Sequence, residues 1–160
     1  MARMRSSLMP LDTTSFLRIA REIAKSSTCT RGSVGAVIVQ DRRIVSTGYN
    51  GAPPGMPHCT DVGCLLPLTT ESPKRLETNP GCQRAIHAEM NAIAWAARHG
   101  VATEGATLYS THGPCLKCAQ AMLAAGIERV YFVHEYRLHE GWELLDKASV
   151  PTYQIHLEDF

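Results

Sequence analysis

The sequence lacks the features that define several large classes of protein. It has no apolar run as long as a membrane-spanning helix needs, and the apolar pair Leu8 and Met9 is interrupted at once by Pro10. It also has no internal repeat and no low-complexity tract. We therefore expect a cytoplasmic protein with no secretory signal and no membrane partner.

Charge of either sign is also scarce. Charged residues make up 19% of the chain and the formal net charge is +1, which is typical neither of a disordered chain nor of a broad nucleic-acid-binding surface. No nucleic-acid polymer is expected as a partner. Eight of the sixteen basic residues lie between Arg3 and Arg43, which fits either a local phosphate site or a solvated helix face.

What the sequence does contain is enough apolar material for a core, arranged in alternating strands and helices. At 44% hydrophobic residues, the 160 residues fit one domain spanning 1–160. Apolar periodicity and turn residues predict a helix over 16–24 capped by Asp12 or a following Thr, a hairpin of strands 34–39 and 44–49, a helix from about Arg84 to Gly100, a strand over 106–111, a helix over 114–125, a strand over 130–133, a short helix over 142–147 and a last strand over 152–156. Strands that alternate with helices predict an α/β fold whose sheet is covered on both faces.

Residues 50–83 interrupt this regular pattern. The segment holds six prolines and four glycines between Asn50 and Gly81, which predicts a long irregular loop. A loop of this length inside a compact domain is usually functional, or is held in place by something other than its own packing.

One imidazole, two thiols and a carboxylate recur in a spacing that suits zinc chemistry. His87 and Glu89 are two positions apart, and Cys115 and Cys118 follow Pro114, with Cys115 26 positions after Glu89. One His and two Cys can hold zinc with its fourth position open, where a water is ionised. Glu89 points away from His87 on a helix, so it is predicted to move protons rather than to bind the metal.

Two further predictions concern the helix that carries the thiols. Pro114 suits the first helical turn, which would place Cys115 and Cys118 on one side of that helix, where its positive end favours thiolates. The alternative is a closed structural zinc site that takes His112 as its fourth ligand.

Four other cysteines flank or lie near the long loop. In a reducing compartment, Cys29, Cys59, Cys64 and Cys82 are metal ligands or free thiols rather than disulfides. A tetrahedral structural zinc there would stabilise the loop. His58 competes for one of the ligand positions, and unligated thiols are the alternative.

The His-x-Glu and Pro-Cys-x-x-Cys halves together are typical of zinc-dependent nucleobase deaminases. From Ser26 to Ile155 the chain resembles the deoxycytidylate (dCMP) deaminases of the cytidine deaminase superfamily. The segments that carry the resemblance are 34–39, 48–55, 87–93 and 114–118. The resemblance implies a three-layer α/β/α sandwich around a mixed five-stranded sheet.

The same resemblance implies an activity and its regulation. It implies hydrolysis of dCMP to dUMP and ammonia for dTTP synthesis, in a homo-oligomer between dimer and hexamer. It also implies control by dCTP and dTTP, with Mg²⁺ accompanying the triphosphate effector. By similarity Asn50 would contact the deoxyribose, while Gly51, Gly55 and Arg98 would lie near the effector or subunit contact.

The substrate phosphate has two candidate partners, Arg31 before the first strand and Tyr136 after the fourth, because an arginine fork suits phosphate. By resemblance, the ligands of the second zinc include Cys29 and Cys59. Asn50 before Gly51 is also a common turn pair.

His112-Gly113 stands where relatives usually carry an apolar or small pair, so a wider space beside the ring could admit 5-substituted dCMP. The zinc motif is also compatible with a deaminase of dCTP, free cytidine, cytosine or a tRNA base. The non-enzyme alternative is a catalytically silent zinc-binding interaction module, against which an intact Glu89 argues.

Overall fold

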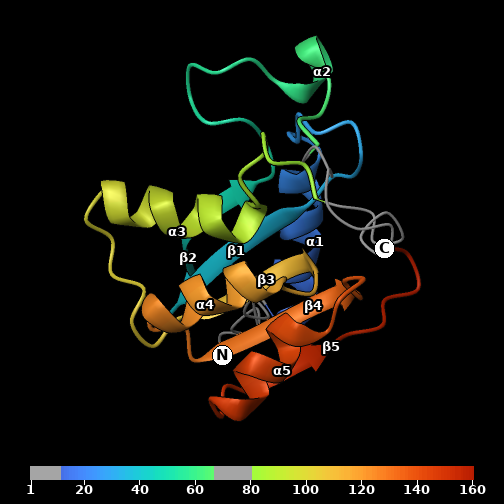
Figure 1. The fold of residues 1–160 in the computed structure, drawn as a ribbon. Coiled ribbons are helices and arrows are strands. Elements are labelled where there is room, and N and C mark those ends of the chain that lie inside the picture. Colours follow the sequence, from blue (N-terminus) through green and yellow to red (C-terminus); the bar gives the residue numbers. More distant parts are fainter. Residues whose placement is uncertain (1–11, 67–80) are drawn as a thin grey trace, which may run out of the picture.

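A mixed five-stranded sheet lies at the centre of the computed structural model, which describes residues 12–66 and 81–160. The strand order is β2-β1-β3-β4-β5 (Figure 1). Strand β1 (Gly35–Gln40) pairs antiparallel with both β2 (Arg43–Tyr49) and β3 (Thr107–His112). Strands β4 (Arg129–His134) and β5 (Thr152–Gln154) continue the sheet in parallel pairings. The predicted mixed sheet is confirmed.

The predicted hairpin between β1 and β2 is also confirmed, with a turn of two residues. Asp41 and Arg42 both have positive φ, 51° and 63°. Two consecutive residues of this kind form the turn whose twist matches that of paired strands. The turn is built without glycine, and a non-glycine residue at positive φ carries a conformational cost.

Helices cover both faces of the sheet, as the sandwich prediction requires (Figure 1). Helix α1 (Thr13–Ala24) packs on one face, and its N-cap is Asp12, whose side chain accepts a hydrogen bond from Ser15 N at 2.8 Å. Helices α3 (Ala88–Arg98), α4 (Leu116–Ala124) and α5 (Glu140–Lys147) lie on the other face.

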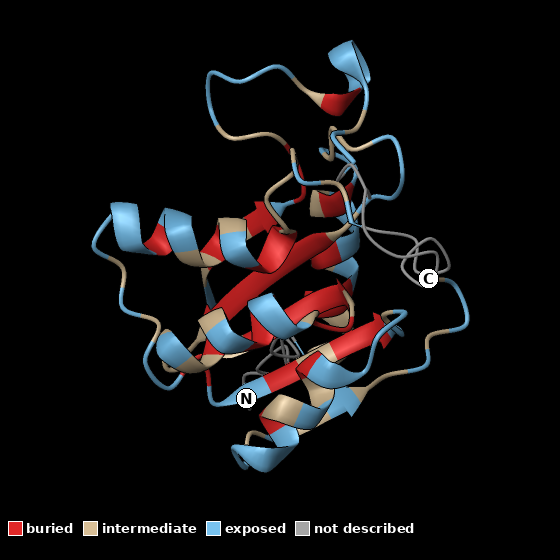
Figure 2. Cartoon of the chain, in the orientation of Figure 1, coloured by how far each residue is buried: buried red, intermediate tan, exposed pale blue. Residues whose placement is uncertain are grey.

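Strand β1 shows how the sequence builds two cores at once. Val37 and Val39 belong to the core under α1, while Ile38 between them belongs to the core under α3 and α4. Successive side chains of a strand point to opposite faces, so an uninterrupted apolar run serves both layers. Burial is accordingly concentrated in the strands and on the inner sides of the helices (Figure 2).

The segment after β2 projects beyond one end of the sheet (Figure 1). It is irregular where it is described, except for the short helix α2 (Cys59–Val62), which the sequence pattern did not predict. Residues 67–80 of the predicted loop, and Arg3 at the other end of the chain, lie outside the described residues. Within 12–66 and 81–160, the helices are too short or too polar to span a bilayer.

Two predicted helix starts were wrong by a few residues. Helix α3 begins at Ala88 instead of near Arg84, because Ile86 is held extended by a bridge to Gly51, with Ile86 N donating to Gly51 O at 2.8 Å. Helix α4 begins at Leu116, so Pro114 precedes the cap and does not occupy the first turn.

Candidate metal centre and active site

The predicted His-Cys-Cys set is assembled at the N-termini of two neighbouring helices. His87 is the N-cap of α3 and Cys115 is the N-cap of α4, with Cys118 one turn further on. His87 Nδ1 lies 3.4 Å from Cys115 Sγ and 3.5 Å from Cys118 Sγ. The sequence spacing therefore predicted which three side chains meet.

This geometry fits a zinc ion. Zinc bonds of about 2.3 Å to sulfur and 2.1 Å to nitrogen place tetrahedral ligand atoms roughly 3.6 Å apart, and the observed separations are close to that value. The backbone amide of Cys118 also donates to Cys115 Sγ at 3.5 Å. A helix N-terminus adds positive partial charge that favours thiolate over thiol.

The pKa values of the two thiols diverge. The Cys118 thiol, followed by His87 and the Cys118 backbone amide, lowers the pKa of Cys115 to about 4, although burial opposes this. The contact with Cys115, together with burial, raises the pKa of Cys118. Contact with Cys115 raises the pKa of His87 in spite of burial. Two adjacent thiolates repel each other, and a divalent ion held between them would neutralise both charges.

His112 does not complete the set. The ligand atoms of His87, Cys115 and Cys118 lie within 4.8 Å of one another, and no fourth His, Cys, Asp or Glu of the described ranges joins them. His112 Nδ1 instead lies 2.9 Å from Thr111 Oγ1, and burial, reinforced by His134, lowers the His112 pKa to about 4. The arrangement has an open position, as hydrolytic zinc sites do.

Glu89 lies beside the three ligand residues and faces the same space. It is 3% exposed, and its Oε2 is 3.5 Å from Cys118 Sγ. Burial raises the pKa of this carboxyl group, in spite of opposing effects from its own backbone amide and from His87. A carboxyl group whose pKa moves toward neutrality can exchange protons during a reaction near pH 7.

A cavity of about 260 Å³ opens onto this centre. Its walls include His87, Glu89 and Cys115, together with the predicted substrate residues Asn50, Arg31 and Tyr136. The structure thus brings these predicted residues to one cavity.

The three residues predicted for the effector or subunit contact lie outside the lining of this cavity. Gly51 and Gly55 follow β2 and do not line the cavity, and Arg98 is exposed in the last turn of α3. Gly51 is buried and pairs with Ile86, just before His87.

Asn50 supports the cavity wall through its own side chain. Asn50 Oδ1 accepts from Val34 N, and Asn50 Nδ2 donates to Gly32 O, both at 2.8 Å. Asn50 is 8% exposed. It therefore fixes the segment before β1, and one lone pair and one N–H remain for a ligand.

Arg137 is a cavity residue that the sequence pattern did not indicate. Its Nη2 donates to the Tyr136 hydroxyl at 3.3 Å, and its guanidinium lies 5.5 Å from the Tyr136 ring centroid. Its charge opposes the rise in the pKa of His87 that Cys115 causes. No spacing rule applies here, because the segment after β4 is irregular.

Gly113 has a packing role in the structure. A Cβ placed there would lie 3.3 Å from the Phe132 ring and 3.4 Å from Tyr136 N. The missing side chain therefore makes room for β4 and the segment that follows it. The packing at Gly113 therefore gives no support to the predicted extra space beside a 5-substituted pyrimidine ring.

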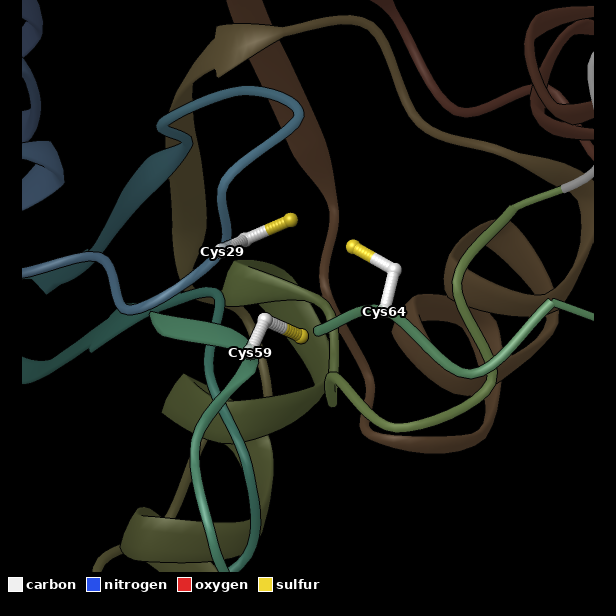
Figure 3. Close-up of side chains that lie close together, drawn as sticks. All are labelled: Cys29, Cys59 and Cys64. Carbon is white, nitrogen blue, oxygen red and sulfur yellow. The ribbon is translucent and has the colours of Figure 1, made fainter. Parts of the chain in front are cut away.

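Three of the four remaining cysteines converge outside the catalytic set. The sulfur atoms of Cys29, Cys59 and Cys64 lie within 4.8 Å of one another and point toward a common centre (Figure 3). Cys82 Sγ is 3.6 Å from Cys59 Sγ. His58 is the N-cap of α2 and lies outside this group.

The pKa values of Cys59 and Cys82 in this group shift in opposite directions. Burial raises the pKa of Cys59 to about 12, and the neighbouring Cys82 and Cys64 add to this. Burial also acts to raise the pKa of Cys82, but the backbone amides of Arg84 and Ala85 and the Cys59 thiol lower it to about 7. Cys29 and Cys82 also line the cavity of the first centre, so the two groups share a wall.

Comparison with known proteins gives the class of this site. The cytidine and deoxycytidylate deaminase zinc-binding region matches residues 11–134. The chain belongs to this family of zinc-dependent deaminases, which are hydrolases.

Individual relatives are similar over most of their length. ComE operon protein 2 of Bacillus subtilis (strain 168) is 41% identical over 145 residues, covering 90% of this chain and 71% of that protein. The deoxycytidylate deaminase of Mycobacterium phage D29 is 43% identical over 122 residues, covering 75% and 92%. The crystal structure of the dCMP deaminase from cyanophage S-TIM5 in complex with dCMP and dUMP superposes with a TM-score of 0.73 at 27% identity, covering 89% and 95%.

Proposed function

We propose that this deaminase hydrolyses dCMP to dUMP and ammonia. The observation that carries the proposal is a three-ligand His-Cys-Cys set with an open position, placed beside the buried Glu89 at the wall of a nucleotide-sized cavity. The relatives support the substrate, since several are named deoxycytidylate deaminase and one was crystallised with dCMP and dUMP.

The metal-binding residues set the chemistry that is available. His87, Cys115 and Cys118 would hold zinc, and zinc bound there supplies a water molecule that ionises near neutral pH. The two thiolates would balance the charge of the ion.

Glu89 moves the protons of the reaction. Its carboxylate accepts a proton from the attacking water and delivers it to the ring nitrogen next to the attacked carbon. It then takes the remaining proton from the new hydroxyl group on that carbon and passes it to the amine. The carbon–nitrogen bond breaks, and water and dCMP become dUMP and ammonia. Burial of Glu89 raises its pKa, which makes both the acid and the carboxylate accessible within one cycle.

The remaining cavity residues orient the nucleotide. Asn50 offers its unused amide N–H and lone pair to the deoxyribose while its other groups hold Gly32 and Val34. Arg31 and Tyr136 would bind the monophosphate. Gly51, Gly55 and Arg98 would serve the subunit contact of a homo-oligomer and the binding of dCTP or dTTP with Mg²⁺.

A second zinc would stabilise the loop after β2. Cys29, Cys59 and Cys64 supply three ligands, and Cys82 is the nearest fourth because its sulfur already contacts Cys59. Because Cys29 and Cys82 also line the cavity, this zinc would fix part of the cavity wall.

A substrate panel tests the proposal. The zinc-loaded protein is assayed for ammonia release with dCMP, CMP, dCTP, deoxycytidine, cytosine and 5-methyl-dCMP, each with and without dCTP and magnesium as effectors. We expect the highest kcat/KM with dCMP. A higher value with any other member, or no ammonia from any of them, would contradict the proposal.

A further inference from the structure

The cavity is lined by a guanidinium group that has no carboxylate partner among the described residues. Arg137 lines the cavity that contains His87 and Glu89. Within the described part of the chain the ion pair found is Lys25 with Glu22, at 2.8 Å. No described carboxylate lies within 4.0 Å of Arg137, so its charge is available to an anionic ligand.

The charge around the cavity favours an anion at this place. Arg31 and Arg137 both line it, and Glu89 is the one acidic side chain among its described lining residues. Glu89 is buried, and its Oε2 lies 3.5 Å from Cys118 Sγ, on the metal side of the cavity. A ligand that enters therefore meets positive charge, and the segment after β4 supplies part of it.

The orientation of Arg137 is held by its neighbour. The guanidinium lies over the ring of Tyr136, and one of its amino groups is bound to the Tyr136 hydroxyl. Nη2 also lies 3.6 Å from where a Cβ at Gly81 would be, so the guanidinium lies beside the Gly81 backbone. Nη1 and Nε have no hydrogen-bond partner among the described residues. With the second N–H of Nη2, one of them completes a planar fork that matches two oxygens of a phosphate.

We propose that Arg137 binds the 5′-phosphate of the substrate and sets the preference of this enzyme for a nucleotide over a nucleoside. The Tyr136 hydroxyl, which accepts from Arg137, donates its own proton to the same phosphate. The proposal rests on the proposed function, because it takes dCMP as the substrate, and it adds a residue that determines specificity.

Two pairs of measurements test this proposal. Arg137→Gln is compared with wild type and with Arg129→Gln, an exposed arginine at the start of β4 that lines a different cavity. We expect Arg137→Gln to lower kcat/KM for dCMP by about 10- to 100-fold, the size of a charge-assisted hydrogen bond, and to leave deoxycytidine turnover within twofold. Arg129→Gln should change neither, and Arg137→Lys should fall between, because it keeps the charge without the fork.

Binding of the product gives a readout that does not depend on turnover. Calorimetry with dUMP and deoxyuridine should show that Arg137→Gln weakens dUMP by the same factor and leaves deoxyuridine unchanged. Equal loss for nucleotide and nucleoside, or no loss for either, would overturn the assignment. The same holds if Arg31→Gln shows the selective loss while Arg137→Gln does not.

The outcomes separate this inference from the proposed function. If the wild type releases no ammonia from dCMP, the proposed function fails, while dUMP and inorganic phosphate binding still report on Arg137. If dCMP is the best substrate and Arg137→Gln retains full selectivity, the inference fails alone.

Discussion

Replacing Gly141 by alanine should disturb the metal centre, because Gly141 packs against the backbone of Pro114 and Cys115 at the start of α4. A Cβ at Gly141 would lie 2.1 Å from Pro114 O, 2.7 Å from Cys115 C and 2.8 Å from Cys115 O. All three contacts are with backbone atoms, so no side-chain rotation relieves them. The start of α5 and the Pro114–Cys115 segment must separate by about 1 Å to restore van der Waals contact.

Two effects of opposite sign compete in this variant. Alanine is favoured over glycine inside a helix by about 1 kcal/mol, whereas an overpacked core site costs about 1–3 kcal/mol or more. We expect a net loss of about 1–2 kcal/mol, because the clash with backbone is the larger effect. Movement of Cys115 should also weaken zinc binding, and a misplacement of about 1 Å can cost 10²-fold in rate.

The assay combines thermal unfolding with zinc competition by a chromophoric chelator. Glu143→Ala in the same helix, whose side chain is exposed, is the control and should match wild type in both. A Gly141→Ala protein that is as stable as wild type, and holds zinc equally well, would refute the close packing of α5 on Cys115.

Three further predictions follow from other parts of the site. Asn50→Ala should lower the unfolding free energy by about 1–3 kcal/mol, because the backbone groups of Gly32 and Val34 lose two partly buried hydrogen bonds. It should also reduce kcat/KM for dCMP. Asn50→Asp, which keeps the acceptor, should lose less stability in thermal melts. The pKa of His112 falls from 6.5 to about 4 on folding through burial and the nearby His134. The folded protein therefore loses stability as pH falls from about 6.5 to 4, because the unfolded chain takes up a proton that the folded His112 does not. The loss is up to about 2 kcal/mol once solvent screening is counted. His112→Gln should flatten that part of the Tm–pH curve, and an unchanged slope would contradict the lowered pKa of His112. Cys59→Ser should reduce bound zinc from two ions to one by elemental analysis and lower Tm, with Cys82→Ser causing the smaller loss; one zinc in the wild type would remove the second site.

Local patterns carried the prediction of the sheet and of the metal ligands. Val37, Ile38 and Val39 form an apolar run bounded by turn residues, and this is enough to predict a buried strand. The spacing of Cys115 and Cys118 fixes their common side wherever the helix begins within a residue or two. That is why the three predicted ligand residues lie together although Pro114 lies outside the helix.

The features that the sequence could not predict depend on contacts between segments that are distant along the chain. The bridge between Gly51 and Ile86 shortens α3, and no local periodicity encodes a pairing across 35 positions. Arg137 belongs to the cavity because β4 ends beside it. The closeness of Gly141 to Cys115 depends on how α5 packs, which a helical pattern leaves open.

The most direct test of the catalytic account is Glu89→Gln in protein with its full zinc content. The substitution keeps the size of the side chain and removes its capacity to carry protons, so ammonia release from dCMP should fall by about 10²- to 10⁴-fold while zinc content and Tm stay close to wild type. Undiminished turnover with zinc in place would contradict the role of Glu89 and the mechanism built on it.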